Sequence, residues 1–263
     1  MYPFNYIRAA DVAAAVQACS GESRYLAGGQ SLVQSMKLRL ASAENLVDLG
    51  GIASLRGIQV DAAGVTIGAM TTHAEVAASA EVRQAIPALA ALAGGIGDAQ
   101  VRALGTIGGS VANADPAADY PAGLLGLGAT VRTNKRTIAA DAFFKGLFET
   151  ALEPGELVTA VQFPRAARAA YVKFKQPASR FALVGVFVAQ GAGGVRVAVT
   201  GAKAAAYREP ALEAALARSF TPAAAQAVKL AVEGMNADLH ASASYRAAMV
   251  SVMAARAVAA ANG

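Results

Sequence analysis

The sequence contains a single cysteine, Cys19, no tryptophan and only two histidines among its 263 residues. One thiol cannot form a disulfide within the chain, complete a four-cysteine zinc site or hold an iron–sulfur cluster. The histidines, His73 and His240, lie far apart in sequence and have no acidic or cysteine partner at metal-ligand spacing. We therefore expect both to be structural or surface residues, with no metal site and no Ser/His/Asp hydrolase chemistry.

Long apolar runs are also missing. No uncharged stretch with membrane character reaches the roughly 18 residues that would span a bilayer. The first residues, MYPFNYIRAADVAAAV, lack a cationic start followed by a long apolar core. We therefore expect a cytoplasmic protein with no membrane span, and the single cysteine favours a reducing compartment.

Charged residues make up 16% of the chain and hydrophobic residues 55%, a globular composition. The net charge is +5, but the lysines and arginines are scattered, without the dense basic blocks of a nucleic-acid surface. Between Leu157 and Arg208 there are eight basic side chains and no acidic one. This stretch is either an ordinary solvated face or a surface that meets an anionic cofactor or an acidic partner.

Hydrophobic periodicity and turn residues predict short alternating elements. We expect a helix over 10–19, a strand over 24–27, a helix over 31–39 and a strand over 45–49, which together form a small βαβ-like unit. Strands around 57–60 and 65–70 and helices over 72–79 and 85–92 follow, and then a loop. Beyond Pro164 three strand-like segments precede alanine-rich helical ones, so we expect α+β order and a second domain from about Arg165.

The first glycine pair lies in YLAGGQSL, where Gly28 and Gly29 turn the chain between a strand and a helix. Ser31 is the expected N-cap of that helix. A turn of this kind points backbone N–H groups into open space at a helix N-terminus, where anions are favoured.

The second pair, Gly108 and Gly109 in TIGGSVANADP, is followed by the short polar side chains of Ser110 and Asn113. Each pair alone could be an ordinary turn, but two of them, each followed by a small polar residue, favour the two sides of a diphosphate clamp. The fingerprints G-x-G-x-x-G and G-x-x-x-x-G-K-[ST] do not occur, so neither a Rossmann site nor a P-loop is predicted.

Two carboxylates follow in the same stretch, Asp115 and Asp119, next to Pro116 and Pro121. Pro121 suits the first turn of a helix over PAGLLGLG. For Asp119 two interpretations stay open: it caps this helix, or its carboxylate accepts hydrogen bonds from ribose hydroxyls or the flavin edge of a bound cofactor.

AGGQS at 27–31 and TIGGSVANADPAAD at 106–119 together resemble the paired signatures of the FAD-binding medium subunit of molybdenum hydroxylases, the family of carbon monoxide dehydrogenase and xanthine dehydrogenase. PFNYIRA, TTHAEVA, GELVTAVQFP and YVKFKQPASRFALVGV follow the order of that family, so the resemblance covers nearly the whole chain.

The resemblance implies an α+β fold: a PCMH-type FAD domain over 1–165, with subdomains of about 1–56 and 57–165, and a C-terminal domain over 166–263 with a three-stranded antiparallel sheet and helices. It implies non-covalent FAD, with both glycine pairs around the diphosphate. The implied contacts are Leu26, Ala27, Gly28, Gly29, Gln30, Ser31, Leu32, Thr106, Ile107, Gly108, Gly109, Ser110, Asn113, Asp115, Asp119, Leu157, Val158, Lys173 and Phe181.

Three positions depart from the family pattern: Gln34 replaces a frequent proline, Ser110 replaces asparagine, and Phe181 replaces a tyrosine found in some members. Serine keeps a hydrogen-bonding group at shorter reach, whereas Phe181 has no hydroxyl to donate. Phe181 either packs against the flavin or is a core aromatic at the start of a strand.

The resemblance implies an oxidoreductase subunit. It would take electrons from two two-iron two-sulfur clusters in a small partner, which receives them from a molybdopterin-binding large partner, and pass them to NAD or another acceptor. The implied assembly is a heterotrimer that dimerises. A stand-alone flavin-dependent oxidase is the main alternative, although Gln30 stands where covalent relatives carry a histidine; a scaffold without cofactor is the other.

Overall fold

A three-stranded parallel sheet opens the chain in this computed structural model, which describes residues 1–263. Strand β3 (Asn45–Asp48) lies between β1 (Asn5–Arg8) and β2 (Arg24–Leu26), and helices α1 (Val12–Ala18) and α2 (Leu32–Lys37) connect the strands. The Asp11 carboxylate caps α1 by accepting a hydrogen bond from the N–H of Ala14 at 2.8 Å. The predicted βαβ-like unit is present, and β1 adds an unpredicted third strand.

The second sheet has five antiparallel strands. Their order is β4 (Ile58–Val60), β5 (Gly64–Gly68), β10 (Val158–Pro164), β6 (Thr130–Thr133) and β7 (Thr137–Ala139). In the central strand, Val161 lies between Ile67 and Val131, and all three side chains are buried. Shorter elements flank this sheet in the chain: η1 (Ala53–Leu55), η2 (Ala140–Ala142), β8 (Phe144–Gly146) and β9 (Glu149–Thr150).

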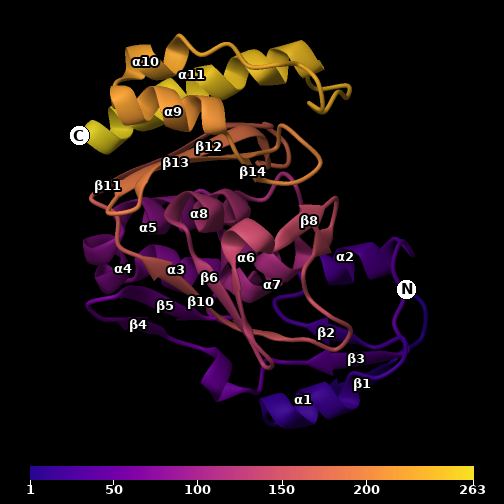
Figure 1. Ribbon diagram of the computed structural model, residues 1–263. Helices are drawn as coiled ribbons and strands as arrows, with labels where there is room; N and C mark the ends of the chain where they lie inside the picture. The colour runs from indigo at the N-terminus through magenta and orange to yellow at the C-terminus, as the bar shows by residue number, and fades with distance from the viewer.

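Six helices cover one face of the five-stranded sheet (Figure 1). They are α3 (His73–Ala78), α4 (Ala80–Ala85), α5 (Pro87–Gly94), α6 (Ala99–Leu104), α7 (Ile107–Asn113) and α8 (Asp119–Leu127). Leu89, Leu92 and Leu124 from these helices join Ile67 of the sheet in the largest hydrophobic cluster of the protein. The predicted helices over 72–79 and 85–92 correspond to α3 and α5, whereas α4 and α6 were not predicted.

The prediction of a loop after α5 is wrong in part, because Gly108 and Gly109, the second glycine pair, lie inside helix α7. Thr106 caps this helix by accepting a hydrogen bond from the N–H of Gly109 at 3.1 Å. Ala114 ends it in the left-handed conformation, with φ of 47°. Only residues 114–118 separate α7 from α8.

The third sheet is antiparallel, with strands β11 (Arg168–Lys175), β12 (Ala182–Gly191), β13 (Gly194–Thr200) and β14 (Tyr207–Arg208) in that order. The first three are the three strands expected for the C-terminal region, and the two-residue β14 adds an edge. Side chains along β12 alternate between two cores. Phe187 packs with α5 and α8, whereas Val186 and Val188 pack against α9 (Pro210–Arg218), α10 (Pro222–Gln226) and α11 (Ala243–Asn262).

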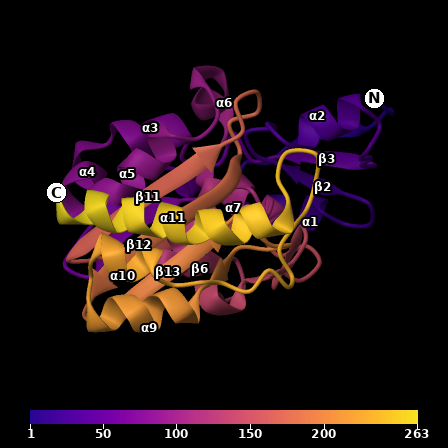
Figure 2. The same ribbon diagram turned by 90° about the horizontal axis from the view of Figure 1, so that it is seen from above.

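The layers therefore follow one another as helices α9–α11, the third sheet, helices α3–α8 and the five-stranded sheet, with the parallel sheet at one side (Figure 1). From above, α11 lies across β11 and β12, and the N-terminal unit lies on the side away from the C-terminus (Figure 2). No helix combines the length and apolar character needed to cross a bilayer. The chain passes from the second sheet to the third between Pro164 and Arg168, near the boundary that we predict at 165/166.

Candidate cofactor cleft

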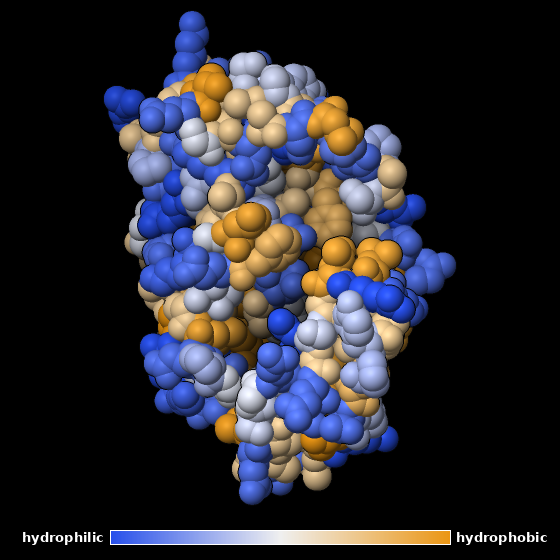
Figure 3. All heavy atoms as spheres, turned by 90° about the vertical axis from the view of Figure 1, so that its right-hand side faces the viewer, coloured by the Kyte–Doolittle hydropathy of each residue, from blue (hydrophilic) through white to orange (hydrophobic).

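A cleft of about 500 Å³ lies where the parallel sheet, the helical layer and the start of β12 meet. All but three of the nineteen predicted contact residues line it, the exceptions being Leu26, Ile107 and Lys173. On the side of α2 and the β8–β9 hairpin, the protein surface is hollowed in the middle, and hydrophobic side chains flank the hollow (Figure 3). Residues from four separate parts of the chain are thus brought to one cleft.

The first glycine turn offers a row of free donors. The backbone N–H groups from Ala27 to Leu32 donate no hydrogen bond to any acceptor in the protein. Ser31 is the N-cap residue of α2, as predicted, but its hydroxyl makes no bond to the helix. Six consecutive N–H groups at the edge of a cleft and at a helix start form a site suited to an anion.

Glycine is required at both positions of this turn. Gly29 has φ of 71°, a conformation that side chains disfavour. A Cβ atom at Gly28 would lie 2.0 Å from the carbonyl oxygen of Leu104, at the end of α6. The first turn therefore packs directly against the backbone that leads into the second.

The second glycine pair has a different role from the first. The N–H groups of Ile107 and Gly108 donate to the carbonyls of Thr71 and Ala69, at 3.1 and 2.8 Å, and that of Gly109 donates to Thr106. Its donors left for a ligand are therefore the side chains of Ser110 and Asn113, which line the cleft without a protein partner.

Bare backbone is needed here for packing. A Cβ atom at Gly108 would lie 2.5 Å from Cβ of Ala69, and one at Gly109 would lie 3.3 Å from Cβ of Ala27. The second contact shows that the two glycine turns face each other across a gap that only hydrogen fills. The two turns therefore pack against each other, and both line the cleft.

Asp119 lies at the floor of the cleft, 5% exposed, at the first residue of α8. It makes no capping bond, so the capping interpretation is wrong. Its carboxylate accepts hydrogen bonds from the Tyr171 hydroxyl and from Lys173 Nζ, the latter at 2.8 Å. Burial raises the pKa of Asp119, and the ammonium of Lys173 opposes that rise.

Lys173 lies behind Asp119 rather than at the cleft surface. Its ammonium also donates to the carbonyl oxygen of Arg180 at 2.9 Å, and its side chain is only 9% exposed. Asp115, by contrast, lines the cleft and accepts a hydrogen bond from the N–H of Ala117 at 2.8 Å, and burial raises its pKa. Lys173 therefore reaches a ligand only through Asp119 and the Arg180 backbone.

Residues 2–166 match the family of FAD binding domains in molybdopterin dehydrogenase. The chain belongs to this family. The glyceraldehyde dehydrogenase medium chain of Sulfolobus acidocaldarius is 37% identical over 199 residues, which are 72% of this chain and 71% of the relative. The carbon monoxide dehydrogenase medium chain of Hydrogenophaga pseudoflava is 37% identical over 191 residues, 68% of this chain and 67% of the relative.

Solved structures agree with these sequence matches. A chain of the Cu,Mo-CO dehydrogenase in its cyanide-inactivated form superposes with a TM-score of 0.88 at 34% identity, covering 99% of both chains. A chain of quinoline 2-oxidoreductase from Pseudomonas putida 86 gives a TM-score of 0.89 at 28% identity, covering 99% of this chain and 97% of the other. The predicted family, fold class and FAD cofactor are confirmed.

The cleft of this FAD-binding chain fits an extended dinucleotide. The free N–H groups of the first turn suit the diphosphate, whose oxygens accept hydrogen bonds, since no acceptor in the protein competes for these donors. Phe181 is 44% exposed at the cleft, so the interpretation of this ring as a core aromatic is wrong. The neighbouring Arg180 donates through Nη1 to the carbonyl oxygen of Gly97 at 3.2 Å and so links the third sheet to the helical layer.

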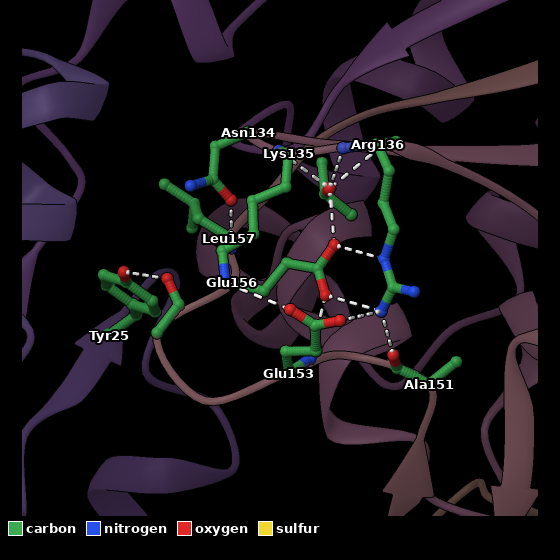
Figure 4. Close-up of polar contacts among 10 residues, drawn as sticks. Tyr25, Asn134, Lys135, Arg136, Ala151, Glu153, Glu156 and Leu157 are labelled. Carbon is green, nitrogen blue, oxygen red and sulfur yellow. Dashed lines mark hydrogen bonds and ion pairs between the residues drawn. The ribbon is translucent and has the colours of Figure 1, made fainter.

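A turn that precedes β10 forms another wall (Figure 4). The N–H of Leu157 donates to Asn134 Oδ1 at 2.8 Å, and its carbonyl oxygen accepts from the N–H of Asn134 at 3.0 Å. Tyr25 in β2 donates its hydroxyl proton to the carbonyl oxygen of Gly155 at 2.9 Å. Because both backbone groups of Leu157 are bonded, this residue offers only its side chain to a cofactor.

Sequence reasoning missed several residues at the cleft. Tyr25, Ile96, Gly97, Glu156 and Arg180 line it without belonging to a glycine pair. The only local signal for Glu156 was its place in GELVTAVQFP, two residues before strand β10.

His73 is buried, as expected of a structural histidine, but it also lines the cleft. Its ring lies 5.4 Å from that of Tyr120, and its Nδ1 has no partner in the protein. Burial lowers its pKa to about 4, and the nearby charge of Arg102 adds to this. His73 is therefore neutral at physiological pH.

Proposed function

We propose that this chain is the FAD-carrying electron-transfer subunit of a molybdenum hydroxylase. It would receive electrons from iron–sulfur clusters in a partner subunit and deliver them to NAD or another acceptor. The observation that carries the proposal is the row of six N–H groups without a protein acceptor, in residues that line the cleft of a chain of this family. Bound FAD supplies the redox chemistry, since a flavin exchanges electrons singly or as a pair.

The residues of the chain would bind and orient the cofactor. The N–H groups of 27–32 would hold the diphosphate, with the side chains of Ser110 and Asn113 adding donors from the second glycine turn. Leu157, Val158 and Phe181 would pack against the isoalloxazine ring. We propose non-covalent binding, since Gln30 occupies the place in the first turn where an attachment residue would be expected.

The partners would be a molybdopterin-binding large subunit and a small subunit with two two-iron two-sulfur clusters. Two observations support them. A single cysteine is too few to ligate an iron–sulfur cluster in this chain. The tip of the β8–β9 hairpin also exposes Leu147 and Phe148, at 62% and 56%, as side chains at a subunit interface would be in an isolated chain. We also propose a cytoplasmic location.

A visible spectrum of the purified chain, before and after acid precipitation, tests the cofactor binding. Twin flavin bands that move to the supernatant support non-covalent FAD, whereas a colourless protein that ignores added FAD would leave only the scaffold alternative. Copurification of the tagged chain from its native host tests the partners. Two further subunits with molybdenum and iron support the proposal, and substrate turnover by the isolated monomer would favour the stand-alone oxidase instead.

A further inference from the structure

The most heavily bonded side chain at the cleft is Glu156, and its side chain is fully buried. Its Oε1 accepts from Arg136 Nε at 3.0 Å and from the Thr133 hydroxyl at 2.7 Å. Its Oε2 accepts from Arg136 Nη2 at 3.0 Å and from the N–H of Glu153 at 2.8 Å. Four donors thus converge on one carboxylate (Figure 4).

These bonds join segments that are far apart in the chain. Arg136 lies in the turn between β6 and β7, and its Nη2 also donates to the carbonyl oxygen of Ala151 at 2.7 Å. The forked pairing of a guanidinium with a carboxylate fixes both position and orientation. The hydrogen bonds with Arg136 are the main reason that the pKa of Glu156 is lowered to about 2, so the pair stays ionised at any pH at which the protein functions.

Glu156 lies within a turn that lines the cleft, so its ion pair with Arg136 bears on the cleft wall. It is flanked by Gly155, whose carbonyl oxygen Tyr25 binds, and by Leu157, whose backbone Asn134 binds on both sides. The carboxylate points toward Arg136 (Figure 4), and residues 155–158 of the turn that carries it line the cleft. The conformation of this wall is therefore fixed from behind.

We propose that Glu156, paired with Arg136, is a positioning residue for FAD: it holds the Gly155–Val158 turn against the isoalloxazine end of the cofactor. The inference rests on the proposed function and assigns to one ion pair the control of that wall. When the pair is broken, the turn loses its anchor, Arg136 keeps only the half-exposed Glu153 as a carboxylate partner, and one negative charge is lost behind the flavin site. Both effects act on bound FAD, the first on its affinity and the second on its reduction potential.

The test compares Glu156→Gln with Glu153→Gln in the full chain. Glu153 belongs to the same network but is half exposed, pairs with Lys135 and Arg136 at the surface and does not line the cleft. FAD affinity is measured by fluorescence titration, ring environment by visible circular dichroism, and reduction potential by dye equilibration. We expect Glu156→Gln to weaken FAD binding by at least about ten-fold, alter the visible dichroism and raise the potential, and Glu153→Gln to stay within about two-fold.

Asn134→Ala is the second variant, in case Glu156→Gln does not fold. It removes the side-chain bond to the N–H of Leu157 while keeping the charge pair. Weaker FAD binding with an unchanged potential would support separate roles for the turn and the charge.

Three results would overturn the inference. They are wild-type affinity and dichroism in Glu156→Gln despite lower thermal stability, equal losses in Glu156→Gln and Glu153→Gln, and wild-type FAD binding in Asn134→Ala if Glu156→Gln fails to fold. Failure of the wild-type chain itself to bind FAD would refute the proposed function, and the inference with it.

Discussion

Replacing Gly28 with alanine should remove FAD from the cleft. The added Cβ atom would lie 2.0 Å from the Leu104 carbonyl oxygen and 2.7 Å from its carbonyl carbon, both of them backbone atoms that no rotamer change can move. The first turn must therefore shift by at least about 1 Å to regain van der Waals separation. A shift of that size takes an N–H···O distance of about 2.9 Å beyond hydrogen-bonding range.

The magnitude follows from the number of bonds lost. Hydrogen bonds to a charged acceptor contribute about 1.5–3 kcal/mol each, so losing two diphosphate bonds costs about 3–6 kcal/mol. This corresponds to a dissociation constant that is roughly 10²- to 10⁴-fold higher. Fluorescence titration with FAD measures it directly, and far-ultraviolet circular dichroism reports whether the variant is folded.

Gly193→Ala is the matched control. Gly193 lies in the β12–β13 turn, its φ is not positive, and a Cβ atom there would meet nothing within 4 Å. This variant should bind FAD as the wild type does. A folded Gly28→Ala protein whose FAD affinity falls by less than about five-fold would refute the assignment of the first turn to the diphosphate.

Three further substitutions test other parts of the cleft. Gly109→Val should abolish FAD retention after desalting with the fold largely kept, because the valine side chain does not fit between the two glycine turns. Its Cβ atom alone would lie 2.9 Å from Thr106 Oγ1. Normal flavin absorbance in this variant would exclude the second turn from the site. Lys173→Met should lower the free energy of unfolding, measured with urea, by about 3 kcal/mol at neutral pH, because it leaves the Asp119 carboxylate buried without its cation. This loss should shrink in acid, because Asp119, whose pKa is raised, is then protonated and needs no cation. Burial lowers the pKa of His73 to about 4, below its value of about 6.5 in the unfolded chain, so the contribution of His73 to stability is fully present above about pH 6.5 and is lost as the pH falls. The free energy of unfolding should therefore drop by about 2 kcal/mol between about pH 7.5 and about pH 5. Urea unfolding at these two pH values should show this drop in the wild type and not in His73→Gln.

Turn chemistry made much of the fold predictable. Asp11 and Gly21 bracket α1, and the glycine pair at 28–29 separates β2 from α2, so the first unit follows from local signals. The apolar run along β12 predicted a strand but not which layer covers each of its faces, because that depends on the packing of helices far away in the chain.

Helix α7 shows where local signals fail. Its sequence, IGGSVAN, contains two glycines and a serine, which favour a loop. The helix forms because Thr106 caps it and because glycines let it approach Ala69 within a distance that no other residue permits. The same two glycines that predicted a bare phosphate loop therefore serve helix packing, a distinction that depends on the β5–α3 connection, more than thirty positions earlier.

Part of the cleft could likewise be predicted from local sequence and part could not. The row of N–H groups at 27–32 follows from a local turn, and the sequence predicted it. The contacts that hold the walls do not, since Tyr25 reaches Gly155, Lys173 reaches Asp119 and Arg180 reaches Gly97 across 130, 54 and 83 positions. The donors proposed for the diphosphate therefore come from a local glycine turn, whereas the contacts behind the proposed flavin site join residues that the glycine turns do not specify. Differences in reduction potential among such chains should arise from these contacts, because they decide which charge lies behind the ring and how firmly each wall is held.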